Sequence, residues 1–314
     1  MQSKTNEQAL ESAIEKCLTG TCLEELKEKG IALSMVNEHP ELYRCGNYYY
    51  ISTPDDFNAK LAIDEYRLFD FLQSTQKDEL LKLQKQSDWK LKILERLDRM
   101  IKKYGVIRIF RKGLDVDDAH FTMLYPLPLA SSSETVKTNF ENNQFSVTRQ
   151  LRYSLSNPGE EIDMVLFANG LPFATIELKN RWTGQNAKVH GQNQYKFKRD
   201  ISQTLLNFGR CIVHFTLDTD EVYMTTKLNG SETFFLPFNL GNNFGKGNPV
   251  NPHGHKTSYL WEEIFTRESI ANIIQHFVRF DGKDTDPLNK KTLYFPRYHQ
   301  LDVVRKLVAD AGSK

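Results

Sequence analysis

The spacing of apolar residues divides the chain into a helical first part and a strand-rich centre. Apolar positions three and four apart between Asn6 and Leu18 predict an amphipathic helix that ends at Gly20. Residues 56–104 are rich in Leu, Lys, Asp and Glu and contain neither Pro nor Gly, so they predict two or three helices closed by Gly105. Because both signs of charge are mixed in this block, we interpret it as a solvated helical face.

Short alternating runs predict β-strands after Gly105. They span residues 106–111, 120–125, 144–153, 163–167, 173–178, 211–217 and 221–226, with an earlier strand at 48–51 and a helix at 187–208. Strands interrupted by one helix are typical of a mixed sheet in an α/β protein. The Gly-, Asn- and Pro-rich segment 239–255 predicts an irregular surface loop, followed by a helix at 261–280 and a polar linker at 281–290.

Composition excludes several classes of protein. The 314 residues are 39% hydrophobic and 26% charged, which excludes a disordered chain, a collagen and a disulfide scaffold. Net charge is only +1, so the chain as a whole lacks the basic excess of a nucleic-acid-binding protein. With no long apolar run and no secretory signal at the start, we expect a cytoplasmic protein without a membrane segment. The irregularly spaced Cys17, Cys22, Cys45 and Cys211 are expected to be reduced.

Acidic and basic residues end the two arms of a predicted hairpin at 161–180. Asp163 opens the first strand, and Glu177 and Lys179 lie two apart, on one face of the second strand. Two carboxylates can hold a hard divalent cation through oxygen, and the ammonium can orient water or stabilise charge on phosphoryl oxygens. This pattern suits hydrolysis of a phosphodiester.

The length of the turn decides whether these carboxylates meet. A two-residue turn at Asn169-Gly170 would pair Asp163 with Ile176 and place Asp163 and Glu177 on opposite faces. A three-residue loop, Ala168–Gly170, with Gly170 left-handed in a bulge, would pair Asp163 with Thr175 and place both acids on one face. We predict the three-residue loop.

The segment after Lys179 is locally basic, with aromatic residues between the charges. It contains Arg181, Lys188, Lys196, Lys198 and Arg199 together with Trp182, Tyr195 and Phe197. Such a segment attracts backbone phosphates.

The hairpin resembles the PD-(D/E)xK nuclease core, and more closely the N-terminal part of the restriction (R) subunit of type I restriction-modification enzymes. The resemblance lies in Ile162-Asp163-Met164-Val165-Leu166-Phe167, Asn169-Gly170-Leu171-Pro172 and Ile176-Glu177-Leu178-Lys179-Asn180, and further in 142–150, 218–226 and 257–263. It implies a restriction-endonuclease-like core with a central mixed β-sheet flanked by helices, here with a helical insertion at 56–104. It also implies metal-dependent cleavage of double-stranded DNA with Mg²⁺ at Asp163 and Glu177, partner methyltransferase (M) and specificity (S) subunits, and coupling to ATP-driven translocation.

The resemblance also implies supporting residues. A glutamate on the first helix assists the metal site in this family, and either Glu11, which we prefer, or Glu7 fits that place. The family carries a Gln-x-x-x-Tyr pattern after the lysine, whereas this chain has Gln192-Asn193-Gln194-Tyr195, so either Gln192 or Gln194 is the counterpart. With Tyr195 and Lys196, these residues are expected to bind the DNA backbone.

The last residues resemble the glutamine motif that precedes the first motor domain of superfamily 2 helicases. Phe295-Pro296-Arg297-Tyr298-His299-Gln300 carries this likeness and makes Gln300 a candidate nucleotide-binding residue. No Gly-x-x-x-x-Gly-Lys-Ser/Thr loop occurs in the sequence, so ATP would act only through motor domains outside it. We therefore expect a nuclease domain at 1–285, a linker and the start of a motor at 286–314, and a fragment weakly active or inactive alone.

Two other functions fit the same sequence. A non-catalytic docking module could join the motor to its partner subunits and would need no metal. A repair or RNA-processing nuclease with the same core would differ only in its substrate.

Overall fold

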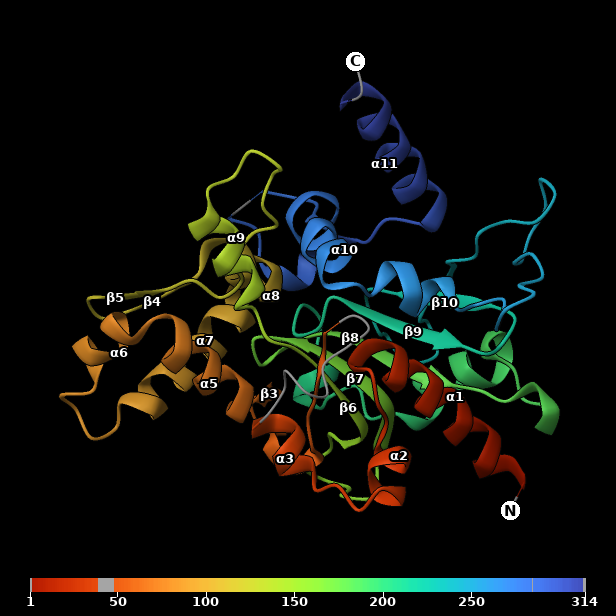
Figure 1. The fold of residues 1–314 in the computed structure, drawn as a ribbon, viewed down its shortest axis with the longest axis horizontal. Helices are drawn as coiled ribbons and strands as arrows, with labels where there is room; N and C mark the ends of the chain where they lie inside the picture. The colour runs from red at the N-terminus through yellow and green to blue at the C-terminus, as the bar shows by residue number, and fades with distance from the viewer. Residues whose placement is uncertain (1, 39–47, 284, 313–314) are drawn as a thin grey trace.

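The computed structural model describes residues 2–38, 48–283 and 285–312, and its centre is a seven-stranded mixed sheet (Figure 1). The strand order is β1-β6-β7-β8-β9-β10-β11, parallel between β1 and β6 and between β8 and β9, and antiparallel elsewhere. The strands are β1 (Tyr50–Ile51), β6 (Phe145–Arg152), β7 (Glu161–Ala168), β8 (Leu171–Leu178), β9 (Val213–Leu217), β10 (Val222–Thr225) and β11 (Leu236–Pro237). The predicted α/β fold with a mixed sheet flanked by helices is confirmed.

Three helices precede the sheet: α1 (Gln2–Thr19), α2 (Leu23–Glu28) and α3 (Leu33–Glu38). The apolar stripe that predicted α1 supplies Leu10, Ile14 and Leu18 to the core, each at most 4% exposed. Since α1 contacts β6 and β8, its other positions lie close to the end of the hairpin.

The predicted helical insertion is confirmed, with a small addition. It contains α5 (Glu65–Thr75), α6 (Lys77–Leu83) and α7 (Trp89–Tyr104), and Gly105 ends α7 as expected. A 3₁₀ turn, η1 (Pro54–Asp56), and a two-stranded hairpin of β2 (Phe57–Asn58) and β3 (Ile63–Asp64) precede these helices. These pieces are too short to show any periodicity in the sequence.

The strand expected at 106–111 is wrong, because these residues form helix α8 (Val106–Lys112). Its β-branched and aromatic residues favour a strand locally, but Val106, Ile107, Ile109 and Phe110 are all buried by packing against neighbouring helices. Tertiary packing thus outweighs the local preference. The strand expected at 120–125 is shorter, since β5 (Ala119–Phe121) pairs only with β4 (Leu114–Val116) before α9 (Glu134–Glu141).

The helices of the second half are shorter than expected. The helix predicted at 187–208 ends at Lys198, as two π-type turns, η3 (Ala187–Gly191) and η4 (Gln194–Lys198), with a separate 3₁₀ turn η5 (Thr204–Leu206). The helix predicted at 261–280 is divided into η6 (Leu260–Ile264), α10 (Arg267–Asn272) and η7 (Ile273–Phe277). The chain then forms β12 (Arg279–Phe280), η8 (Leu288–Lys290), β13 (Leu293–Tyr294) and α11 (Tyr298–Gly312). The segment 239–255 contains no helix or strand, as predicted.

Apolar side chains fill both faces of the sheet. The larger core includes side chains from α1, α5, α7, α8 and α10 packed with Met164, Ile176 and Phe215 of the strands. A smaller cluster under the helix at 187–198 includes Val165 and Tyr195. Within the described part of the chain, no helix is both long and apolar enough to cross a bilayer.

Cysteines form no bridge in the described residues. Cys17, Cys22 and Cys211 are free thiols, in agreement with the expectation, and Cys45 lies outside the described residues.

Candidate active site

The turn of the β7–β8 hairpin differs from the prediction. Asn169 and Gly170 both have positive φ, 49° and 80°, which is the conformation of a two-residue turn with Ala168 paired to Leu171. The predicted three-residue loop and the pairing of Asp163 with Thr175 are therefore wrong. A two-residue turn alone would have separated the acids onto opposite faces.

A bulge in β8 restores the convergence of the two acids by another route. Phe167 pairs with Pro172, but Leu166 pairs with Ala174, so Phe173 is an extra residue in the second strand. Pro172 has no N–H to donate to the ladder, and proline in a sheet is typically found at such bulges. Farther along, Met164 pairs with Ile176, which brings the next residue on each strand, Asp163 and Glu177, level with each other.

Asp163 closes the end of this ladder with its side chain. Its Oδ2 accepts a hydrogen bond of 2.7 Å from the main-chain N–H of Leu178. The carboxylate raises the pKa of Glu7, Glu11 and Glu177, so its negative charge acts on all three. The carboxylates of two strands and one helix therefore lie near one another.

Glu177 is a fully buried carboxylate held by one cation. Its Oε1 accepts a 2.6 Å hydrogen bond from Nε of Arg199, while its Oε2 is buried without a hydrogen-bond partner. Burial raises the pKa of Glu177 to about 8, the charge of Asp163 adds to the rise, and Arg199 opposes it. The unpaired Oε2 leaves one oxygen that a cation could satisfy.

Lys179 follows Glu177 by two residues and is 6% exposed. Its main-chain N–H donates to Leu217 O at 2.9 Å, and its Nζ donates to Leu178 O at 2.6 Å. The side chain lines a small pocket of about 150 Å³ between α1 and the loop after β8; the other lining residues are Ala9, Leu10, Asn180, Trp182, Thr219 and His255. The ammonium is thus near a small opening at the end of the sheet.

Both candidate glutamates of α1 lie close to Asp163. Burial raises the pKa of Glu11 to about 7, with a further rise from Asp163. Burial also raises the pKa of the half-buried Glu7, while Lys179 and the main-chain N–H of Asn180 lower it. Glu7 therefore faces the ammonium more directly than Glu11, and the choice between them stays a prediction.

Glu11 belongs to a buried cluster around Arg149 of β6. Nε of Arg149 donates to Glu11 at 3.0 Å, and its other nitrogens donate to Glu15 at 3.0 Å and to Glu24 at 2.8 and 2.9 Å. Glu11 also accepts from Gln150. One guanidinium therefore fastens α1 and α2 to the sheet beside the site.

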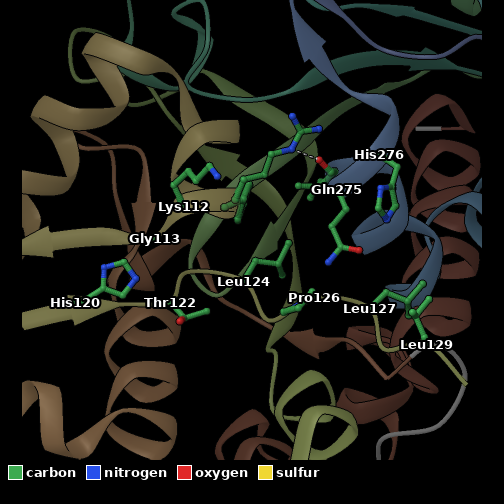
Figure 2. A pocket seen from close by; sticks show the side chains of 13 residues that line it. Lys112, Gly113, His120, Thr122, Leu124, Pro126, Leu127, Leu129, Gln275 and His276 are labelled. Carbon is green, nitrogen blue, oxygen red and sulfur yellow. Dashed lines mark hydrogen bonds between the residues drawn. The ribbon is translucent and has the colours of Figure 1, made fainter. Parts of the chain in front are cut away.

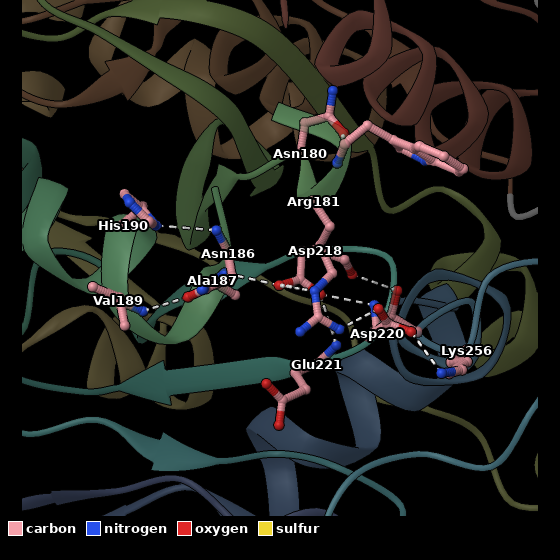
Figure 3. Close-up of polar contacts among 12 residues, drawn as sticks. Asn180, Arg181, Asn186, Ala187, Val189, His190, Asp218, Asp220, Glu221 and Lys256 are labelled. Carbon is pink, nitrogen blue, oxygen red and sulfur yellow. Dashed lines mark hydrogen bonds and ion pairs between the residues drawn. The ribbon is translucent and has the colours of Figure 1, made fainter. Parts of the chain in front are cut away.

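The loop after Lys179 is fixed by acids of the β9–β10 turn (Figure 3). The carboxylate of Asp218 accepts hydrogen bonds from the N–H groups of Ala187, Asp220 and Glu221 at 2.8–3.0 Å. Asp220 forms ion pairs with Arg181 and, at 2.7 Å, with Lys256. These contacts hold the start of the helix at 187–198 against the sheet.

The predicted DNA-binding residues lie on that helix. Gln192, Gln194 and Lys196 are partly exposed, but Tyr195 is fully buried in the smaller apolar cluster. Its hydroxyl is 2.7 Å from Oγ1 of Thr175, which in turn is 2.7 Å from Nδ1 of His214. The placement of Tyr195 does not support the predicted contact with DNA, because a phenol turned into the core supports the sheet instead.

Gln300 lies far along the chain, at the start of α11, and is exposed. Its Oε1 accepts a 2.9 Å hydrogen bond from the main-chain N–H of Arg297. Its predicted nucleotide-binding role stays a prediction.

The carboxylates of Asp163 and Glu177 suit a hard cation, even though two protein ligands are a small donor set. In the described ranges no three His, Cys, Asp or Glu side chains are grouped as a metal site. Mg²⁺ is commonly held by one or two carboxylates, with the remaining positions taken by water and substrate phosphates. Asp163 and the unpaired Oε2 of Glu177 fit that requirement.

Residues 124–233 match the family model described as type I restriction enzyme R protein N terminus. This segment belongs to that family. The R protein N-terminal segment covers β6 to β10 and contains Asp163, Glu177, Lys179 and Arg199, whereas α1 and α11 lie outside it. No curated protein matches the chain.

Sequence reasoning missed two residues and one bulge of this site. Arg199 was counted only among the basic residues after Lys179, and Arg149 only within the resembling segment 142–150, because the carboxylates they meet are 22 and 138 residues away. The bulge had one signal in the sequence, Pro172 in a strand that is otherwise apolar.

Proposed function

We propose that this chain is the DNA-cleaving domain of a type I restriction enzyme R subunit, a Mg²⁺-dependent endonuclease acting on double-stranded DNA. One observation carries the proposal. The R protein N-terminal segment contains two carboxylates brought level on adjacent strands, one with an unpaired buried oxygen, and a lysine two residues farther on. In the full protein, motor domains would couple cleavage to ATP-driven translocation, and the M and S subunits would be its partners. The complex would act in the cytoplasm.

Each residue has a separate task in the proposed reaction. Asp163 and Glu177 would hold the ion through carboxylate oxygens, and Arg199 orients Glu177 by taking Oε1, which leaves Oε2 for the ion. Bound there, Mg²⁺ would supply Lewis-acid activation for phosphodiester hydrolysis. Lys179 would exchange its bond to Leu178 O for one to the attacking water or a phosphoryl oxygen, where its charge stabilises the transition state.

The helix α1 completes the site from outside the matched segment. Glu11 is the assisting residue we predict, and Glu7 is the alternative. If Glu11 assists, Glu11→Gln lowers cleavage more than Glu7→Gln. The reverse order would assign the role to Glu7.

The division into domains is part of the proposal. Residues 1–285 would form the nuclease domain, and 286–314 a linker with the start of a motor. Val303, Leu307 and Val308 of α11 are 52–68% exposed at helical spacing, which supports a further unit packing on this helix.

The decisive experiment is cleavage by the complete enzyme carrying substitutions in the site. Asp163→Asn and Glu177→Gln should abolish cleavage, and Lys179→Ala should lower it by at least about a hundredfold, while ATP hydrolysis is retained. Glu161→Gln is the matched control, because Glu161 is on the same strand but pairs with the exposed Arg152. Cleavage retained in the three site variants would favour the non-catalytic docking module.

A further inference from the structure

A groove lies between α8 and the β12–β13 pair, on the opposite side of the molecule from the catalytic edge. It encloses about 280 Å³, and five of its eight lining residues are basic. We define this basic groove by those residues: Arg108, Arg111, Lys112, Arg279 and Lys291. Four of them are exposed, and Lys291 is half-buried.

No carboxylate balances these charges. The lining contains neither Asp nor Glu, and within the described residues no ion pair joins any of the five cations to an acid. Among the acids near these cations in sequence, Asp115 pairs with His120, and Asp281 and Asp286 accept hydrogen bonds from the main-chain N–H groups of Gly282 and Lys283. Like charges held close together repel unless an anion binds among them.

The cations are held in place by contacts that leave their charge available. Arg111 donates to the main-chain oxygens of Ile274 and Val278, which fixes the end of α8 against η7. The guanidinium of Arg108 lies 4.5 Å from the ring centre of Tyr104, and that of Arg279 lies 5.4 Å from Tyr294. A guanidinium already held over an aromatic ring loses little freedom when it binds a phosphate.

A second pocket of about 530 Å³ continues the groove, because it shares Arg111 and Lys112. Figure 2 shows Lys112 and His120 on one side of this pocket, with Gln275 and His276 facing them from the other. The basic groove is therefore open toward a second, mostly apolar hollow rather than closed around a single point.

The basic groove is separated from the catalytic carboxylates by the length of the sheet. The N–H of Val106, at the start of α8, donates to Gly209 O, just before β9 begins. Glu177 instead lies level with Thr216, near the end of β9. Figure 1 shows the sheet between α1 and α8.

We infer that the basic groove binds backbone phosphates of duplex DNA away from the bond that is cut. Its cations come from three separate segments, so they fit a chain of phosphates better than the compact charge of one nucleotide. Arg108 and Lys112 lie about 6 Å apart along α8, close to two steps of the 3.4 Å charge spacing of a DNA strand. This inference rests on the proposed function only in taking DNA as the substrate.

The test is binding of a fluorescent duplex of about 30 base pairs to the 314-residue chain in EDTA, where cleavage does not occur. Lys112→Glu with Arg279→Glu should weaken binding at least about tenfold and reduce the salt dependence by about two ion equivalents. Lys60→Glu with Lys85→Glu is the matched control, since both lysines are exposed and lie outside the basic groove. The milder Lys112→Gln with Arg279→Gln serves if the first variant unfolds.

Other outcomes have defined meanings. Equal duplex affinity in the groove and control variants would overturn the inference. A groove variant that loses binding of free ATP while its duplex affinity is unchanged would also overturn it, because the cations would then bind a nucleotide. If the nuclease proposal fails while the groove variant still loses duplex binding, the groove remains the DNA-binding surface of a non-catalytic module.

Discussion

Arg199 is the residue on which the geometry of Glu177 depends most directly. It is 22 residues beyond Glu177 in sequence and leaves the helix at 187–198 in an extended conformation, with its guanidinium turned back to the sheet. Glu177 is 0% exposed, and the guanidinium forms the ion pair with it inside the protein. Removing one partner of a buried ion pair leaves the other uncompensated.

We therefore predict that Arg199→Met destabilises the chain by about 3–5 kcal/mol. Urea unfolding measures the free energy, and titration of cleavage with Mg²⁺ in the complete enzyme separates positioning from stability. A positioning role requires a higher Mg²⁺ concentration for half-maximal cleavage, even at a temperature where the variant is folded. Arg199→Lys should recover stability more than Mg²⁺ affinity, because one ammonium cannot reproduce the orientation of the guanidinium. An unchanged Mg²⁺ dependence in the folded variant would show that Arg199 is only structural.

His214 makes a separate prediction about pH. Burial lowers its pKa from the ordinary 6.5 to about 3, so the folded chain holds it neutral while the unfolded chain protonates it below pH 6.5. Between pH 6.5 and 3 the unfolded state binds more protons, so stability falls as pH falls. At pH 5 the loss through this group is about 2 kcal/mol.

The measurement compares urea unfolding between pH 7.5 and 5 in the unmodified chain and in His214→Asn. The variant should be less stable at pH 7.5 and should lose about 2 kcal/mol less over this range. His253→Gln is the control, because His253 is exposed. Parallel pH curves for the unmodified chain and His214→Asn would contradict the buried neutral histidine.

At the scale of single residues, the sequence predicts the placement of those side chains whose surroundings are set by near neighbours in the chain. Glu177 and Lys179 share one side of a strand because they are two apart, and His214 is in the core as its apolar surroundings indicate. The burial of Tyr195 was not predictable from a helix with charges on both sides of it. Its hydroxyl meets Thr175, 20 residues away, and only the packing of that helix on the sheet decides this contact.

The hairpin β7–β8 is the element that determines whether the site forms. Gly170 has φ +80°, and a Cβ there would lie 2.5 Å from the main-chain oxygen of Asp64 and 2.7 Å from Leu68. Neither atom can move aside cheaply, because one is backbone and both belong to the start of the helix α5. The turn is thus fixed both by its own conformation and by the insertion packed on it.

Gly170→Ala should accordingly lower the free energy of unfolding by at least about 3 kcal/mol, from left-handed strain together with the clash. Gly184→Ala is the matched control: its φ is +77°, but nothing lies within 4 Å of a Cβ there, so a cost of about 1 kcal/mol is expected. Chemical denaturation of both variants checks the difference. Equal costs would mean that the contact with Asp64 contributes nothing.

Helices and strands were predictable wherever one buried side gave the apolar residues a clear period along the chain. The strands β6, β7 and β8 and the helix α1 follow their sequence patterns closely. The register between β7 and β8 was harder to predict, because it depends on one extra residue, Phe173, rather than on the pattern of the whole strand. The helix α8 was misread because seven residues with four buried apolar positions have no period that distinguishes a helix from a strand.

At the scale of the whole molecule, the site joins the first helix to strands more than 130 residues later. The apolar side of α1 packs on the core, and its acidic side reaches Arg149, where Glu11 and Glu15 are at most 4% exposed. The sequence indicates each half of this arrangement, but nothing in it pairs Glu15 with Arg149, 134 residues away. The overall fold was therefore predictable as a class, while the attachment of α1 at the site was not.

This attachment yields the last prediction. Arg149→Met leaves Glu11 and Glu15 buried without their cation, and it should cost about 3–5 kcal/mol, far more than Arg152→Met on the same strand, whose side chain is 68% exposed. If the charge is the cause, adding Glu15→Gln to Arg149→Met should restore part of the loss, because one of the uncompensated carboxylates is then neutral. Hydrogen exchange should report α1 opening first, and cleavage by the complete enzyme should fall with it. If instead Arg149→Met and Arg152→Met cost the same, the apolar side of α1 alone holds it in place, and the cluster contributes to the site only through the position of Glu11.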